Sequence, residues 1–197
     1  MALMVFGWAG CDGAMAQGRI FEAYFGYAQM TSNSGVSLFS DIQSAQTIPT
    51  VGLSLGWPVS DHATLGVSYR HDFCSFGRQT FSEEYALNRL CCEMVGRKNI
   101  GQDITCMYGF SLGPLMACNT VNIGELTDSY RRYGIVGGPK LGVGYNVGNT
   151  RFGLTYECFA GAFLSKVYEA PQGVALPVAG GRSYWGHSLM LTILTNF

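Results

Sequence analysis

Two adjacent pairs of residues could supply a nucleophile or a base, His71 with Asp72 and His187 with Ser188. Both pairs lie in segments with the alternation of β-strands, where neighbouring side chains point to opposite faces of a sheet. Neither pair is therefore expected to form a nucleophile–base contact. His62 falls in a predicted turn, where we expect it to be solvated. With three histidines and no repeated Cys-x-x-Cys pattern, the sequence predicts no catalytic residue, no metal site and no cofactor.

The composition narrows the choice of fold class. The 197 residues include 27 glycines, 48% are hydrophobic and only 13% are charged, with a formal net charge of −1. This balance excludes the basic surface typical of proteins that bind nucleic acid, and the apolar content excludes disorder. No segment approaches the ~20 consecutive apolar residues of a membrane helix. A soluble β protein and a membrane β-barrel remain.

The start of the chain has the character of a targeting segment. The first ten residues are almost all apolar, and Ala14 and Ala16 form the A-x-A pattern of a signal-peptidase site. We therefore expect residues 1–16 to be a signal peptide, truncated at its start because no basic residue precedes the apolar run, and 17–197 to be the mature domain. Lipidation of Cys11 and a retained apolar N-terminus are the alternatives.

Period-two alternation of apolar and small residues recurs through the mature chain and predicts β-strands. The eight expected strands cover residues 19–30, 50–57, 64–70, 103–112, 115–123, 140–147, 151–158 and 188–197. Tight turns are expected at 58–63, 111–114 and 148–150, and longer connections at 31–47, 74–102, 124–134 and 166–183. Alternating short and long connections are typical of an up-and-down barrel with short periplasmic turns and longer outer loops.

One segment has a helical pattern instead. Thr80 and Glu83 have the spacing of a capping box, apolar residues follow at helical intervals, and Gly96 is a plausible stop. We expect one short helix here, within the second long loop.

Aromatic residues on the apolar faces gather near the expected tight turns. An interfacial girdle is expected at such a rim. Its predicted members are Phe21, Trp57, Phe110, Tyr145, Phe152 and Phe197.

The opposite faces of the strands carry Gly, Ser and Thr with a few charges, which suits a narrow lumen. An eight-stranded barrel is just wide enough for its side chains to fill, and buried charges persist only when they are paired or hydrogen-bonded. We expect an ionic network that plugs the lumen; a narrow, gated ion path is the alternative. Its predicted members are Glu22, Arg70, Asp72, Asp103, Lys140, Arg151 and Glu157.

Three cysteines, Cys74, Cys91 and Cys92, fall in the second long loop. An oxidising compartment favours disulfides. A local bridge from Cys74 to Cys91 or Cys92 is therefore expected.

The hairpin Val51-Gly-Leu-Ser-Leu-Gly-Trp57 to Leu65-Gly-Val-Ser-Tyr-Arg70, together with the C-terminal stretch Leu189–Phe197, resembles a known class. The chain is similar to the small eight-stranded outer-membrane β-barrels of Gram-negative bacteria, the group that includes the OmpA barrel and opacity-type proteins. The resemblance implies an all-β, antiparallel transmembrane barrel in the bacterial outer membrane, surrounded by lipid and lipopolysaccharide. It also implies that the barrel-assembly machinery recognises the C-terminal strand.

These observations predict a barrel without enzymatic activity that has a structural or surface-interaction, adhesin-like role. Its outer loops would contact a surface or host protein partner, and no nucleic acid is expected. A narrow channel for ions or very small solutes is the alternative, and a lipid A-modifying enzyme is the third possibility.

Overall fold

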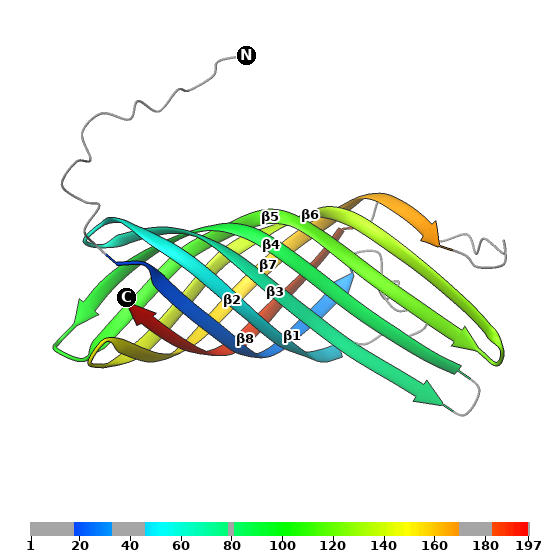
Figure 1. The fold of residues 1–197 in the computed structure, drawn as a ribbon, viewed down its shortest axis with the longest axis horizontal. Helices are drawn as coiled ribbons and strands as arrows, with labels where there is room; N and C mark the ends of the chain where they lie inside the picture. Colours follow the sequence, from blue (N-terminus) through cyan, green and yellow to red (C-terminus); the bar gives the residue numbers. More distant parts are fainter. Residues whose placement is uncertain (1–17, 33–45, 79–80, 170–182, 197) are drawn as a thin grey trace, which may run out of the picture.

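Eight antiparallel strands close into a barrel in which each strand pairs with its neighbours in sequence and β1 pairs with β8 (Figure 1). The computed structural model describes residues 18–32, 46–78, 81–169 and 183–196. These residues contain no helix that is long and apolar enough to span a membrane. The strands are β1 (Ile20–Ser32), β2 (Gln46–Ser60), β3 (Ala63–Arg78), β4 (Phe81–Ile100), β5 (Ile104–Ile123), β6 (Leu126–Val147), β7 (Thr150–Glu169) and β8 (Ser183–Asn196).

The predicted all-β barrel of eight strands is confirmed, but two of the expected strands are wrong. The segment assigned to a loop helix is strand β4, and β5 runs without a turn through 111–114. One strand was thus missed and another divided, so the number stayed at eight. The expected long connection at 124–134 is also wrong, because β6 begins at Leu126.

Strand β4 resembles a helix in sequence because both of its faces carry apolar residues. Tyr85 and Leu87 point into the barrel, whereas Leu90 and Met94 point outward. Apolar residues on both faces erase the period-two signal, and the spacing that remains matches a helix by coincidence.

Glycines in the left-handed conformation stand at three of the turns. Gly101, Gly124 and Gly148 have φ angles of 81°, 61° and 59°. A side chain at such a φ is strained, and glycine is not. The turns at Gly101 and Gly148 lie at the end where β1 begins and β8 ends, and the turn at Gly124 lies at the opposite end.

The strand pairing fixes the tilt of the barrel. The chain of pairs that starts at Phe21 passes through Leu55, Val67, Cys92, Leu112, Gly137, Ala160 and Trp185 and returns to β1 at Thr31, ten residues further on. A shift of ten residues over eight strands corresponds to a tilt of about 40°. Height along the barrel axis therefore changes by about 2.5 Å per residue and by about 3 Å per strand step.

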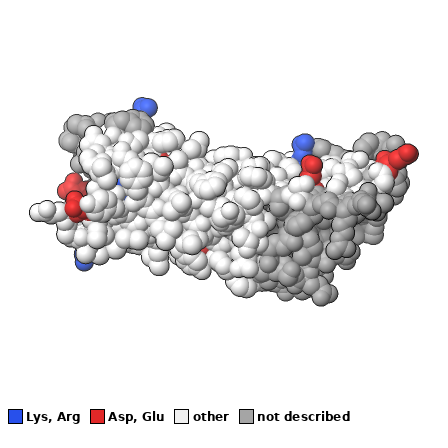
Figure 2. All heavy atoms as spheres, turned by 90° about the horizontal axis from the view of Figure 1, so that it is seen from below, with Lys and Arg blue, Asp and Glu red and all other residues white. Residues whose placement is uncertain are grey.

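The outer surface carries an apolar band. The band begins at the height of Trp57 and extends about 20 Å further away from the end where β1 begins and β8 ends. Within it, the outward-facing described residues include no charged side chain. The far edge of this band is marked by four polar side chains, those of Gln29, His71, Asn88 and His187. On the face seen in Figure 2, Lys, Arg, Asp and Glu gather toward the two ends, and the middle is almost free of them. Such a band matches the roughly 25 Å apolar zone of outer-membrane barrels.

Four of the predicted girdle residues lie at a common height. The register places Phe21, Trp57, Tyr145 and Phe152 within about 4 Å of one another along the axis. Phe197 lies outside the described residues. This shared level supports the expected girdle at the end where β1 begins and β8 ends.

The prediction for Phe110 is wrong, because no turn follows it. Trp57 pairs with Leu65, Leu65 with Met94, and Met94 with Phe110. These three strand steps place Phe110 about 10 Å above Trp57, within the apolar band.

Candidate functional site: the closed lumen

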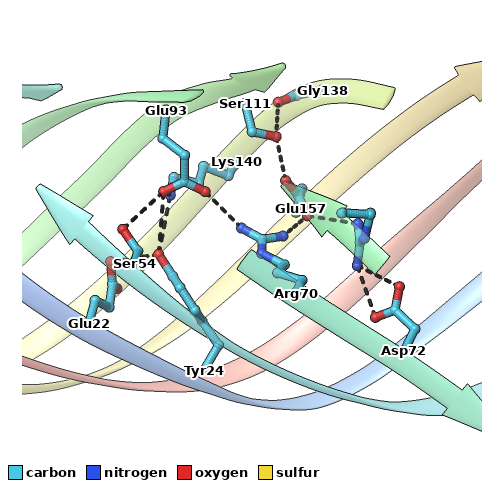
Figure 3. A network of polar contacts seen from close by, with 11 residues as sticks. Glu22, Tyr24, Ser54, Arg70, Asp72, Glu93, Ser111, Gly138, Lys140 and Glu157 are labelled. Carbon is cyan, nitrogen blue, oxygen red and sulfur yellow. Dashed lines mark hydrogen bonds and ion pairs between the residues drawn. The ribbon is translucent and has the colours of Figure 1, made fainter. Parts of the chain in front are cut away.

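Arg70 lies at the centre of a polar network inside the barrel, between Glu93 and Glu157 (Figure 3). One guanidinium nitrogen is 3.2 Å from Glu93 Oε1, and the other forms an ion pair with Glu157. Lys140 Nζ lies 2.6 Å from Glu93 Oε2. The four side chains come from β3, β4, β6 and β7, so the network joins strands on different sides of the barrel.

Arg89 forms the second centre of the network. Its guanidinium is 2.9 Å from Asp72 Oδ2 and 3.5 Å from Glu157 Oε2. The same group stacks on the ring of Phe159, with 4.4 Å between Cζ and the ring centroid. This cation–π contact adds attraction at a desolvated site.

Neutral hydroxyl groups satisfy the remaining carboxylate oxygens. Tyr24 donates to Glu22 Oε2 at 2.8 Å, and Ser111 donates to Glu157 Oε1 at 2.8 Å. Ser54 lies 3.5 Å from Glu93 Oε2. Charges removed from water require such partners, because an unpaired buried charge is very unfavourable.

Charges of opposite sign are equal in number within the ion-paired part of the network. Three bases, Arg70, Arg89 and Lys140, face three acids, Asp72, Glu93 and Glu157. All six side chains are buried. The arrangement fills the lumen from the middle of the apolar band to its far edge.

The structure brings together five of the predicted lumen residues: Glu22, Arg70, Asp72, Lys140 and Glu157. Asp103 was placed wrongly, because it lies exposed in the turn before β5, where its carbonyl accepts a hydrogen bond from the Asn146 amide. Arg151 is half-buried at the barrel mouth and hydrogen-bonds to Asn146 instead of joining the network.

Two central members, Arg89 and Glu93, were missed. Both lie in the segment for which the sequence pattern predicts a helix and which forms strand β4. The sequence does carry a signal for them. They are spaced by two from Tyr85, Leu87 and Cys91, and in a strand this spacing places all five side chains on one face.

A second, apolar layer closes the lumen beyond the network. We call it the apolar plug; its buried members are Ala28, Met30, Ile48, Tyr85, Leu87, Cys91, Leu115, Ala117, Val136, Phe159, Phe163 and Tyr184. The rings of Phe163 and Tyr184 stack with centroids 5.4 Å apart. Most of the plug lies on the side of the network away from the end where β1 begins and β8 ends.

Comparison with known proteins finds likeness in structure alone. No family model matches the chain, and no curated protein is detectably similar in sequence. Neisserial surface protein A superposes with a TM-score of 0.60 at 14% identity, covering 91% of this chain and 97% of that one. A major outer membrane protein from Thermus thermophilus superposes with a TM-score of 0.55 at 11% identity, covering 92% of this chain and 100% of that one. Ail, the attachment invasion locus protein of Yersinia pestis, superposes with a TM-score of 0.54 at 10% identity, covering 89% of this chain and 99% of that one.

The fold is that of the small outer-membrane β-barrels. Its apolar outer band and its resemblance to proteins of the bacterial outer membrane are consistent with the same location for this chain.

The expected disulfide within this barrel is wrong. Cys74 pairs with Tyr85 across the β3–β4 ladder, whereas Cys91 pairs with Ser68. Six residues along a strand separate the two positions by roughly 20 Å, well beyond the reach of a disulfide. Cys91 and Cys92 are free thiols on opposite faces of β4.

The candidate catalytic pairs are divided between the two faces of the barrel wall. His71 faces outward and lies 2.9 Å from Asn88 Oδ1, whereas Asp72 is buried in the lumen. His187 lies beside the ring of Tyr156, whereas Ser188 is buried inside. The described residues also contain no group of three potential metal ligands.

Proposed function

We propose that this protein is a non-conducting outer-membrane barrel that mediates surface interaction, in an adhesin-like role. The observation that carries the proposal is the closed lumen, in which the ionic network and the apolar plug follow one another along the axis. A solute would have to separate paired charges and then displace packed aromatic rings. Transport is therefore a poor explanation for this interior.

The part of the barrel beyond the apolar band offers an alternative place for function. A transmembrane β-strand needs about 9–11 residues, whereas β4, β5 and β7 have 20 residues each and β6 has 22. β5 continues seven residues past Met116, which lies near the far edge of the band, and so reaches roughly 17 Å further. Figure 1 shows β3 to β6 extending past β1 and β2 at the end opposite the start of β1.

The neighbours in structure point in the same direction. One is described as a surface protein and another as an attachment invasion locus protein. We propose that the projecting strands contact a surface or host protein, that lipopolysaccharide surrounds the outer part of the band, and that the barrel-assembly machinery engages β8.

Shortening the projection tests this role. The variant replaces residues 121–128 with Asn-Gly, which joins the paired residues Thr120 and Ser129 through a turn suited to a two-residue hairpin. The matched control replaces Gly148-Asn149 with Asn-Gly at the opposite end. Each protein is displayed on a non-adherent Gram-negative host, and adhesion to epithelial cells and immobilised matrix proteins is measured.

We expect the wild-type protein and the control to confer adhesion, and the shortened variant to lose it while keeping its heat-modifiable mobility on gels. Absence of adhesion by the wild-type protein, or equal adhesion by the shortened variant, would contradict the proposal.

A further inference from the structure

A polar cavity lies at the mouth of the lumen, on the side of the network where β1 begins and β8 ends. Its volume is about 280 Å³, and its lining includes Asp61, Thr64, Arg97, Arg151 and Asn196. The two arginines come from β4 and β7. Neither belongs to the ionic network, so the cavity is a separate feature of the lumen.

Both guanidinium groups hydrogen-bond to neutral atoms. Arg97 donates to Thr64 Oγ1, and its Nε is buried without a hydrogen-bond partner among the described residues. Arg151 donates from Nε to Asn146 Oδ1 at 2.7 Å, and its Nη1 lies 3.9 Å from Met107 Sδ. Each guanidinium has five N–H donors, so these contacts leave donors available to a further acceptor.

The balance of charge also favours an anion here. Once the three bases and three acids of the network are paired, Glu22 is the buried acid that remains on the cavity side, against Arg97 and Arg151. Glu22 already accepts the Tyr24 hydroxyl proton at 2.8 Å. Asp61, which also lines the cavity, is exposed in the β2–β3 turn. The mouth therefore holds two guanidinium groups, Arg97 and Arg151, against one buried carboxylate, Glu22.

We propose that this cavity binds the phosphate or carboxylate group of a small molecule that enters from the periplasmic side. Guanidinium groups present a planar fork that matches both oxyanions. The volume lies near the lower limit for small-molecule pockets, which restricts the ligand to a compact one. This binding is independent of the adhesive role proposed for the opposite end.

The test uses the protein refolded in detergent. Inorganic phosphate and acetate are titrated separately by calorimetry, and then each in competition with the other. The variants are Arg97→Gln and Arg151→Gln. The matched control is Lys98→Gln, which removes the same charge from the exposed side chain next to Arg97.

We expect saturable binding of at least one anion by the wild-type protein and by Lys98→Gln, and binding at least tenfold weaker in both arginine variants. Phosphate binding that acetate does not displace assigns a phosphate ligand, and effective competition by acetate assigns a carboxylate.

Absence of saturable binding of either anion would overturn the proposal, as would arginine variants that bind like the wild-type protein. Heat-modifiable mobility on gels establishes that each variant is folded. Where a Gln variant does not fold, Arg151→Lys retains the charge but lacks the fork, and weaker binding is expected; unchanged binding would count against the site.

Discussion

Glu93 is the acid that holds Lys140 inside the barrel, so its neutralisation should leave a buried cation without a partner. The side chains are 2% and 4% exposed, and the Nζ–Oε2 distance is 2.6 Å. At an effective dielectric constant of about 20, that separation corresponds to about 6 kcal/mol of Coulomb attraction before desolvation is counted. The other hydrogen-bond contact of Lys140 in the described structure is the Tyr24 hydroxyl at 3.5 Å.

We therefore expect Glu93→Gln to lower the free energy of unfolding by about 3–5 kcal/mol, the usual cost of removing one partner from a buried pair. The double variant Glu93→Gln/Lys140→Met removes both charges and should regain most of that loss, because an apolar replacement of a buried pair is often neutral. Arg70 keeps its ion pair with Glu157 in both variants.

The assay is reversible guanidinium unfolding in lipid vesicles, followed by tryptophan fluorescence and by gel mobility without boiling. The matched control is Glu84→Gln, on the exposed part of the same strand, which should change stability by no more than about 0.5 kcal/mol. A loss below about 1 kcal/mol for Glu93→Gln, or a double variant no more stable than the single one, would refute the reasoning.

Three further predictions concern the wall and the plug. Leu191→Arg, on the lipid-facing middle of β8, should lower the free energy of unfolding by about 2–4 kcal/mol in the same assay. The control Ser75→Arg, at an exposed position beyond the apolar band, should lower it little, and equal effects of the two variants would contradict the proposed band. Leu87→Ala should cost about 2–5 kcal/mol, because this plug residue is fully buried; a neutral result would mean that the plug is loosely packed. Alkylation of the unfolded, unreduced protein should modify both Cys91 and Cys92, and mass spectrometry that found either one protected would contradict their free state.

Most of the wall could be predicted from the sequence because the lipid-facing side chains of each strand must be apolar. In β2, Val51, Leu53, Leu55 and Trp57 alternate with small residues, and the structure turns these four side chains outward. The lumen has no comparable rule. Its layers differ along the axis from cationic to ionic to apolar, so the inward positions of a single strand mix all three kinds of residue.

The prediction of two strands in place of β5 had a different cause. Gly113-Pro114 has the composition of a turn, yet both residues lie within the strand, and Pro114 is paired with Ile135 of β6. The β4–β5 ladder skips Gly113 and Pro114, passing from Leu112 to Leu115. A proline lacks the N–H that a central strand requires, and this barrel accommodates it by interrupting the ladder on one side only.

The ionic network could be predicted only in part because its pairs join distant strands. Arg70 and Glu157 are 87 residues apart in sequence, and Lys140 and Glu93 are 47 residues apart. The face of each strand predicts which charges point inward, whereas the partner depends on the register and tilt of the closed barrel. Missing β4 therefore removed Arg89 and Glu93 from the prediction.

Planar-bilayer recording tests the central claim, a lumen closed by the ionic network and the apolar plug, most directly. The refolded protein, shown to be inserted by its heat-modifiable mobility, is added to a bilayer in concentrated potassium chloride, and current is recorded over a range of voltages. The closed lumen predicts no discrete conductance steps above the protein-free bilayer. Reproducible steps from the wild-type protein would contradict the claim and would make a narrow channel the leading function.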